Sequence, residues 1–170
     1  MDKLFLQQLS QLVALPSVSC TDPHIDQGNQ AVIDLLASWL SELGFHCEVM
    51  PISVGKANLI ATLGSGSGGL VLAGHTDTVP CDAQLWASDP FKISERNGNL
   101  YGLGIADMKG FFPVVLNAAQ AFSKTKLKAP LIIIATCDEE SSMAGAKALV
   151  EAAKSKARFA LIGEPTSLKP

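Results

Sequence analysis

The sequence lacks long apolar runs, an excess of positive charge and closely paired cysteines. No apolar stretch in its 170 residues approaches the roughly 20 that a membrane-spanning helix needs, so we expect no membrane partner. Lys and Arg number 13 against 16 Asp and Glu, without a basic stripe, and nucleic acid is therefore not an expected partner. The cysteines form no CxxC pair, which argues against a zinc finger or a redox motif; we expect reduced, mostly buried thiols at Cys20, Cys47, Cys81 and Cys137.

The remaining composition is that of one globular domain. It is 48% hydrophobic and 17% charged, with a net charge of -3, and 170 residues can bury a core without disulfide or metal staples. The N-terminal segment MDKLFLQQLSQLVALPS has apolar residues at helical spacing instead of the continuous apolar core of a signal peptide. These features predict a cytoplasmic protein that starts with an amphipathic helix.

Apolar spacing and turn residues predict helices and strands that alternate along the chain. Helices are expected from residue 4 to Pro16, at 32–43 before Gly44, from near Lys109 with Pro113 in the first turn, and at 143–157. Short apolar runs predict strands at 45–50, 58–63, 70–73, 99–102, 131–135 and 159–162. Because parallel strands need crossover connections, this order favours an α/β fold with an open, mostly parallel sheet and helices on both faces.

Acidic residues and one histidine gather where the predicted strands end. The motif GHTD follows residues 70–73, CDEE follows 131–135, and GEPT follows 159–162. A fourth motif, IADMKG, lies in a loop that can fold back to the same edge of the sheet. Ligands of open α/β sheets bind at the carboxyl ends of the strands, so these motifs predict a binding site there.

The first of these motifs contains a histidine and an aspartate on one face of an extended segment. Asp77 lies two residues after His75 and can accept the proton of the ring nitrogen that does not bind metal. An ordinary hydrogen-bonded histidine is the alternative interpretation. Asp107 can bridge two metal ions through its two oxygens, although a helix-capping carboxylate would fit the same position. Lys109 beside it is expected to be a solvated or ion-paired charge.

The later motifs offer further carboxylates that could bind metal or carry a proton. Adjacent glutamates point in different directions, so one of Glu139 and Glu140 can bind metal while the other remains free to carry a proton. The alternative is that residues 138–140 form a solvated acidic turn. Glu164, between Gly163 and Pro165, is a further candidate ligand, and a loop carboxylate is the alternative interpretation.

Four segments, together with WASDPF before the second of them, resemble the M20 family of metallo-aminoacylases and peptidases: LAGHTDTVP, YGLGIADMKGFF, CDEESSMAGAK and GEPTSLKP. The resemblance implies a zinc aminopeptidase-like catalytic domain with two divalent metal ions, zinc or alternatively cobalt. It implies that His75 and Glu164 bind one metal, that Glu140 binds the other and that Asp107 bridges them. Glu139 would be the general acid and base, and Asp77 would orient His75.

The segments ADMKGFF and DEESSMAGAK are most similar to family members that act on acetylornithine. The resemblance therefore implies a small-molecule N-acylated amino acid as substrate, and hydrolysis of N-acetyl-L-ornithine to L-ornithine and acetate in arginine biosynthesis. Desuccinylation of succinyl-diaminopimelate and dipeptide hydrolysis would use the same metal ligands, so they stay open as alternatives.

Members of the family are longer than this sequence, which shapes one further expectation. They contain a lid or dimerisation domain, and a later part of the catalytic domain supplies another histidine ligand. Residues 1–170 are therefore expected to be the N-terminal part of the catalytic domain of a homodimeric parent. Because His24 and His46 match no motif, we expect the second metal to lack a ligand and the isolated chain to hydrolyse substrate poorly. A non-catalytic truncated module is the alternative.

Overall fold

The computed structural model describes residues 2–153 and 157–167. It has two helices at the start, α1 (Lys3–Val13) and α2 (Gln30–Glu42), followed by the strands β1 (His46–Ser53), β2 (Lys56–Leu63) and β3 (Leu70–His75). A long connection then holds a short 3-10 helix, η1 (Ala83–Leu85), and a small hairpin of β4 (Ser94–Arg96) and β5 (Asn99–Tyr101). The last elements are α3 (Phe111–Phe122), β6 (Leu131–Thr136), α4 (Ala144–Glu151) and β7 (Phe159–Ile162).

The main sheet has five strands in the order β1-β2-β6-β3-β7. Strands β6, β3 and β7 are parallel, as predicted, whereas β1 pairs with β2 and β2 pairs with β6 in antiparallel fashion. The antiparallel pair β1-β2 arises because only a tight turn at Val54 and Gly55 joins the strands, and a parallel pair would need a crossover. The α/β class is thus confirmed, with a parallel core and an antiparallel edge.

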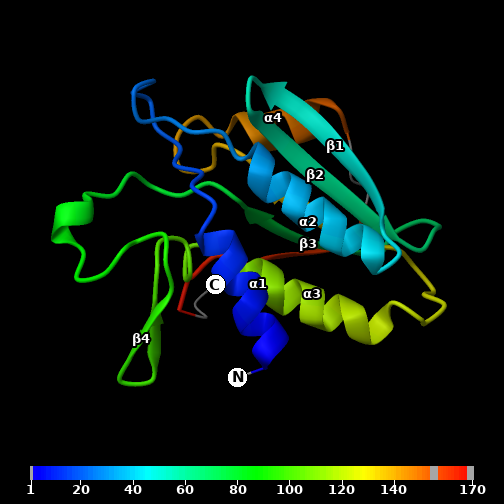
Figure 1. The fold of residues 1–170 in the computed structure, drawn as a ribbon. Coiled ribbons are helices and arrows are strands. Elements are labelled where there is room, and N and C mark those ends of the chain that lie inside the picture. Colours follow the sequence, from blue (N-terminus) through cyan, green and yellow to red (C-terminus); the bar gives the residue numbers. More distant parts are fainter. Residues whose placement is uncertain (1, 154–156, 168–170) are drawn as a thin grey trace.

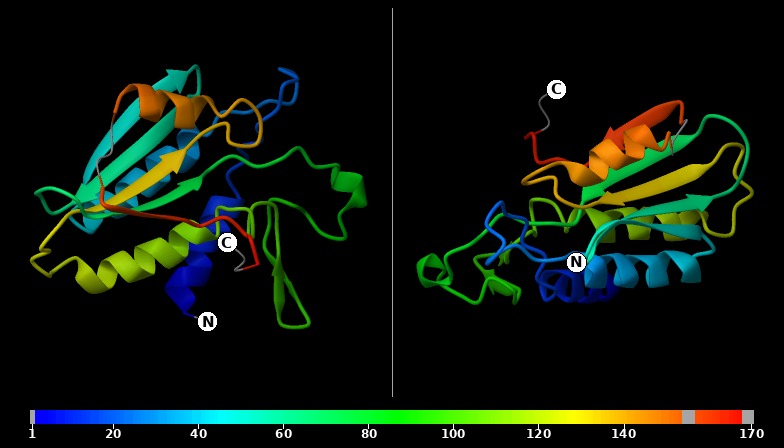
Figure 2. Two further views of the ribbon diagram at one scale, coloured as in Figure 1. Left: turned by 180° about the vertical axis from the view of Figure 1, so that it is seen from behind. Right: turned by 90° about the horizontal axis from the view of Figure 1, so that it is seen from above.

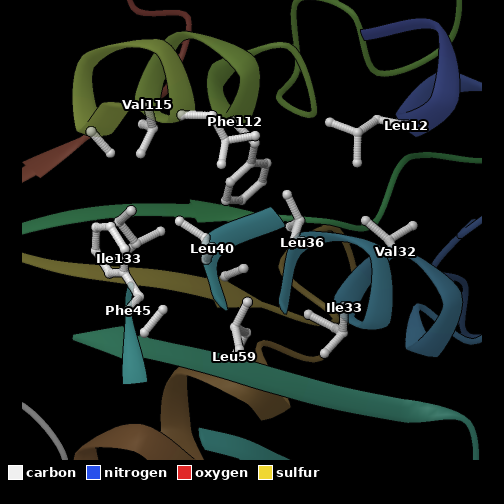
Figure 3. Packing of buried hydrophobic residues seen from close by; sticks show 14 of the residues in the cluster. Leu12, Val32, Ile33, Leu36, Leu40, Phe45, Leu59, Phe112, Val115 and Ile133 are labelled. Atoms are coloured by element: carbon white, nitrogen blue, oxygen red, sulfur yellow. The ribbon is translucent and has the colours of Figure 1, made fainter. Parts of the chain in front are cut away.

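Helices cover both faces of this sheet, as the alternation of side chains requires. Figure 2 shows α4 on one side of the sheet and α1, α2 and α3 on the other. Along β2, Leu59 and Ala61 point into the core under α2 and α3, whereas Ile60 points to the opposite face. The larger cluster includes Leu36, Leu40 and Phe112, which pack together between the helices and the sheet (Figure 3).

The sequence-based predictions of the elements hold with shifted ends. The third helix begins at Phe111, two residues after Lys109, with Pro113 in its first turn. The helix expected over 143–157 is shorter, because α4 ends at Glu151, and residues 154–156 of that prediction lie outside the described residues. The pairing of β5 with β4 was not predicted, and this hairpin projects away from the main sheet (Figure 1).

The cysteines differ in burial, since Cys137 is buried and Cys20, Cys47 and Cys81 are partly exposed. All four cysteines lie in the described part of the chain with free thiols, and burial raises the pKa of the Cys137 thiol to about 12. Within residues 2–153 and 157–167, the helices are too short and too polar to cross a bilayer.

Candidate metal centre

The parallel strands bring the predicted site residues to one edge of the sheet. His75 is the last residue of β3, Glu139 and Glu140 follow β6, and Glu164 follows β7. The loop before α3 folds back to this edge and places an Asp107 carboxylate oxygen 3.0 Å from His75 Nε2. A Glu164 carboxylate oxygen lies 3.6 Å from the same nitrogen. The structure therefore brings to His75 residues that lie 32 to 89 positions after it in the sequence.

These side chains form two groups whose geometry suits a cation. One group joins His75 with Asp107 and Glu164, and the other joins His75 with Glu139 and Glu140. Within each group, the possible ligand atoms all lie within 4.8 Å of one another. An imidazole nitrogen surrounded by carboxylate oxygens is a donor set that divalent metals such as zinc accept. The residues present thus fit a metal site, and they are the residues that the sequence singled out.

The orientation of His75 is fixed by a backbone group as well as by a side chain. Its Nδ1 lies 2.9 Å from the backbone carbonyl of Asp77, so an Nδ1-bound proton is donated there. The Asp77 carboxylate is 3.6 Å from the same nitrogen, which is too long for a strong hydrogen bond. The carbonyl is therefore the nearer acceptor, and the orientation of His75 by the Asp77 carboxylate stays a prediction. Nε2 is left facing Asp107 and Glu164.

The Asp77 carboxylate instead binds the turn after β6. One of its oxygens accepts the backbone N–H of Glu139 at 3.2 Å, and the other accepts that of Glu140 at 3.0 Å. Burial alone would raise the pKa of Asp77, but His75 and these N–H donors lower it overall. Asp77 therefore connects the end of β3 to the two glutamates, a role that the sequence did not indicate.

The electrostatics of the centre favour positive charge. Burial would lower the pKa of His75, but the nearby Asp77 carboxylate, with those of Asp107 and Glu164, raises it to about 9. Burial and then the neighbouring carboxylates raise the pKa values of Glu140 and Glu164, with Asp107 the largest carboxylate contribution to Glu140. A proton on the imidazole thus compensates acidic groups that a metal cation would neutralise in its place.

Asp138, the residue before the two glutamates, is buried, whereas the alternative prediction for residues 138–140 was a solvated acidic turn. Asp138 is only 8% exposed, so residues 138–140 are not a uniformly solvated acidic turn. Its carboxylate binds Lys56, a residue that the sequence reasoning missed because only the fold brings it close.

Lys109 is 1% exposed, so the expectation of a solvated or ion-paired charge was wrong. Its Nζ donates to the carbonyl oxygens of Leu12 and Leu15, at 3.3 and 2.7 Å. Leu12 is in the last turn of α1 and Leu15 follows the helix, and the carbonyls at this end of a helix carry negative partial charge, which explains why they accept a buried lysine. Burial lowers the pKa of Lys109 to about 8.

Comparisons with known proteins agree with this geometry. Residues 71–170 match the model of peptidase family M20/M25/M40. Acetylornithine deacetylase of Pasteurella multocida is 54% identical over 168 residues, and that of Photorhabdus laumondii is 53% identical; the match covers 98% of this chain and 44% of each relative. The chain thus spans less than half the length of these curated relatives.

A solved structure shares the fold. Human carnosine dipeptidase 1 superposes with a TM-score of 0.78 at 27% identity, covering 94% of this chain and 38% of that one. The family model covers more than half of the sequence, including all six predicted site residues: His75, Asp77, Asp107, Glu139, Glu140 and Glu164. The match to the family model and these identities show that the chain belongs to peptidase family M20/M25/M40.

Proposed function

We propose that this chain carries metal-binding and proton-transfer residues of an amidohydrolase that removes the acetyl group of N-acetyl-L-ornithine. The observation that carries the proposal is the convergence of His75, Asp107 and Glu164, with Glu139 and Glu140 beside them, at one edge of the sheet. The identity of more than 50% with proteins named acetylornithine deacetylase supports this substrate.

The proposed ligand roles are those that the resemblance to the M20 family implies, and the grouping of His75 with Asp107 and Glu164 supports the first of them. His75 and Glu164 would bind one metal ion, Glu140 the other, and Asp107 would bridge them. Zinc is the proposed metal and cobalt an alternative, because imidazole and carboxylate ligands suit both. When bound, such a metal pair lowers the pKa of a water molecule and polarises the scissile carbonyl.

Glu139 is the proposed proton carrier. Its carboxylate lies in the same cluster as His75 and Glu140 and is partly accessible, so a water molecule can reach it. It would accept a proton as the water oxygen bonds to the acetyl carbon, and donate it to the amine nitrogen as the C–N bond breaks. The products are acetate and L-ornithine.

A second candidate reaction, dipeptide hydrolysis, is favoured by the similarity to carnosine dipeptidase 1. The chemistry of the metal centre is the same for both reactions, since each breaks an amide. Release of product from N-acetyl-L-ornithine, from a succinylated diamino acid and from dipeptides, measured side by side, would separate these candidates.

The described ligand groups contain a single imidazole, that of His75. Glu140 and a bridging Asp107 would give the second metal two protein ligands, whereas catalytic zinc usually has three. We therefore expect the 170 residues alone to hold one metal ion firmly and to release ornithine slowly. Elemental analysis after dialysis and a deacetylation assay test this, and two firmly held ions with rapid turnover would contradict it.

Variants at the adjacent glutamates test the proposed division of roles. Glu139→Gln should keep the metal content and lower turnover by about 100-fold or more, because only proton transfer is lost. Glu140→Gln should lower metal content itself. If Glu139→Gln lost metal while Glu140→Gln kept it, the two roles would have to be exchanged; if neither variant changed either measurement, the proposed centre would be wrong.

A further inference from the structure

A cluster of three charged side chains, Lys56, Asp26 and Asp138, includes the first residue of the acidic turn (residues 138–140) that follows β6. Lys56 Nζ is 2.7 Å from an Asp26 carboxylate oxygen and 2.6 Å from one of Asp138. The side chains of Lys56 and Asp138 are each only 11% exposed. None of these three residues belongs to the groups that can hold a metal.

Lys56 connects segments that are far apart in the sequence. It begins β2, next to the turn of the β1-β2 hairpin, and is 82 residues from Asp138. Asp26 lies in the loop before α2, where its carboxylate also accepts the backbone N–H of Cys20 at 3.0 Å. The lysine therefore ties the acidic turn to the hairpin and to this loop at the same time.

Asp138 is held in one conformation by further contacts. Its carboxylate accepts hydrogen bonds from the hydroxyls of Ser19 at 3.1 Å and Ser142 at 3.3 Å. Its φ of 58° lies in the left-handed region, where a non-glycine residue needs support from its surroundings. Its backbone carbonyl accepts the N–H of Met143 at 2.6 Å, which closes the turn.

The two residues after Asp138 are the glutamates of the metal centre. Asp77 accepts their backbone N–H groups, as described above, whereas Lys56 and Ser19 bind the side chain of Asp138. With Asp138 fixed inward, Glu139 and Glu140 are directed to the cluster that contains His75. The turn is thus held by two residues, Asp77 and Lys56. Of these, Asp77 also lies beside His75.

The pKa shifts of Lys56 and Asp26 agree with the short distances of these ion pairs. Burial would lower the pKa of Lys56, but hydrogen bonds with Asp138 and Asp26 raise it overall. Burial would raise the pKa of Asp26, but Lys56 lowers it. A buried ion pair contributes little net stability compared with apolar packing, but it demands one geometry of its partners. Its effect is therefore expected on the placement of the turn more than on the stability of the whole fold.

We propose that Lys56 is a positioning residue of the metal centre, which fixes Glu139 and Glu140 by holding the side chain of Asp138. This inference rests on the proposed function for its meaning in catalysis, because it assumes that these glutamates serve the metal. Its structural part, the fastening of the turn, can be measured on the metal-free chain.

The test combines amide hydrogen exchange with cobalt binding in the full chain. In Lys56→Met, the amides of Glu139 and Glu140 should exchange about tenfold faster or more, while those of α2 keep their protection. The Co²⁺ dissociation constant should rise by about tenfold, the usual effect of removing a group that supports metal ligands, and the visible Co²⁺ spectrum should change. Lys56→Arg, which keeps the charge, should recover most of both properties.

Two further variants keep the test decisive. Lys126→Met removes an exposed lysine from the loop after α3 and should change neither measurement. Because Lys56→Met leaves the buried Asp138 charge unpaired and risks unfolding, Lys56→Met combined with Asp138→Asn removes both charges, and its turn amides should still exchange faster.

The outcomes separate this inference from the proposed function. Turn amides that exchange at the wild-type rate in the double variant would overturn the role of Lys56, as would a uniform increase throughout α2 and the sheet. A wild-type chain that binds no Co²⁺ would overturn the proposed function, while the exchange rates would still decide whether Lys56 fastens the turn.

Discussion

Replacement of Asp77 by asparagine tests how the site is built. In the structure both oxygens of this buried carboxylate accept backbone N–H groups, from Glu139 and from Glu140. Asparagine keeps the shape but has one acceptor oxygen, and its NH₂ group would face an N–H donor. One amide of the turn therefore loses its partner while the side chain stays buried.

The expected size of the effect follows from these contacts. A hydrogen bond to a charged group contributes roughly 1.5–3 kcal/mol, and an unsatisfied buried donor costs roughly 1–3 kcal/mol, with some overlap between the two. We therefore expect Asp77→Asn to lower the free energy of unfolding by about 2–4 kcal/mol. The turn that carries Glu139 and Glu140 should also loosen, so metal affinity should fall.

Urea unfolding monitored by tryptophan fluorescence measures the first effect, since Trp39 packs against the main core. The matched control is Asp89→Asn, because the Asp89 carboxylate also accepts a backbone N–H, from Phe91 at 2.9 Å, but on an exposed loop. The control should lose less than about 0.5 kcal/mol. If Asp77→Asn lost no more than Asp89→Asn, the structural role assigned to Asp77 would be refuted.

Two further predictions concern packing and pH. Gly145→Ala should lower the free energy of unfolding by about 2–3 kcal/mol. The added Cβ would lie 2.5 Å from the side-chain oxygen of Asn58 and 2.6 Å from the carbonyl oxygen of Cys137. A denaturant titration measures the change, and an unchanged midpoint would contradict this packing. Metal affinity should rise by about tenfold per pH unit up to about pH 9, because His75, whose pKa is raised to about 9, must release a proton before it binds a cation. Calorimetric titration of the chain with Co²⁺ measures this slope, and an affinity independent of pH between 6 and 8 would show that His75 is not a ligand.

The sequence predicted the placement of the metal-site residues because that placement follows from topology. His75, Glu140 and Glu164 each come just after an apolar run, and the carboxyl ends of parallel strands share an edge. Asp107 required only that its loop fold back, and the structure confirms that it does. The antiparallel pairing of β1 with β2 and of β2 with β6, in contrast, depends on which strands become neighbours. A single apolar run does not specify its neighbour.

The supporting contacts were not predictable in the same way. Lys56 stands beside a tight turn in the sequence, where a solvated lysine is the ordinary expectation, and only the pairing of β2 with β6 brings it near Asp138. Lys109 depends on where the C-terminal end of α1 comes to lie. For Asp77, spacing correctly placed the residue beside His75, but it did not show that the carboxylate would turn toward the next strand.

The distribution of the ligands along the chain has a consequence for mechanical cohesion. His75, Asp107 and Glu164 belong to segments that are separated by long stretches of chain, and the structure joins them at one point. A cation held there would act as a cross-link that closes large loops, comparable in topology to a disulfide but dependent on pH and chelators. Bound metal would then raise the unfolding temperature of three segments together: β3, the segment before α3, and β7. A chelator would lower the unfolding temperature of all three at once.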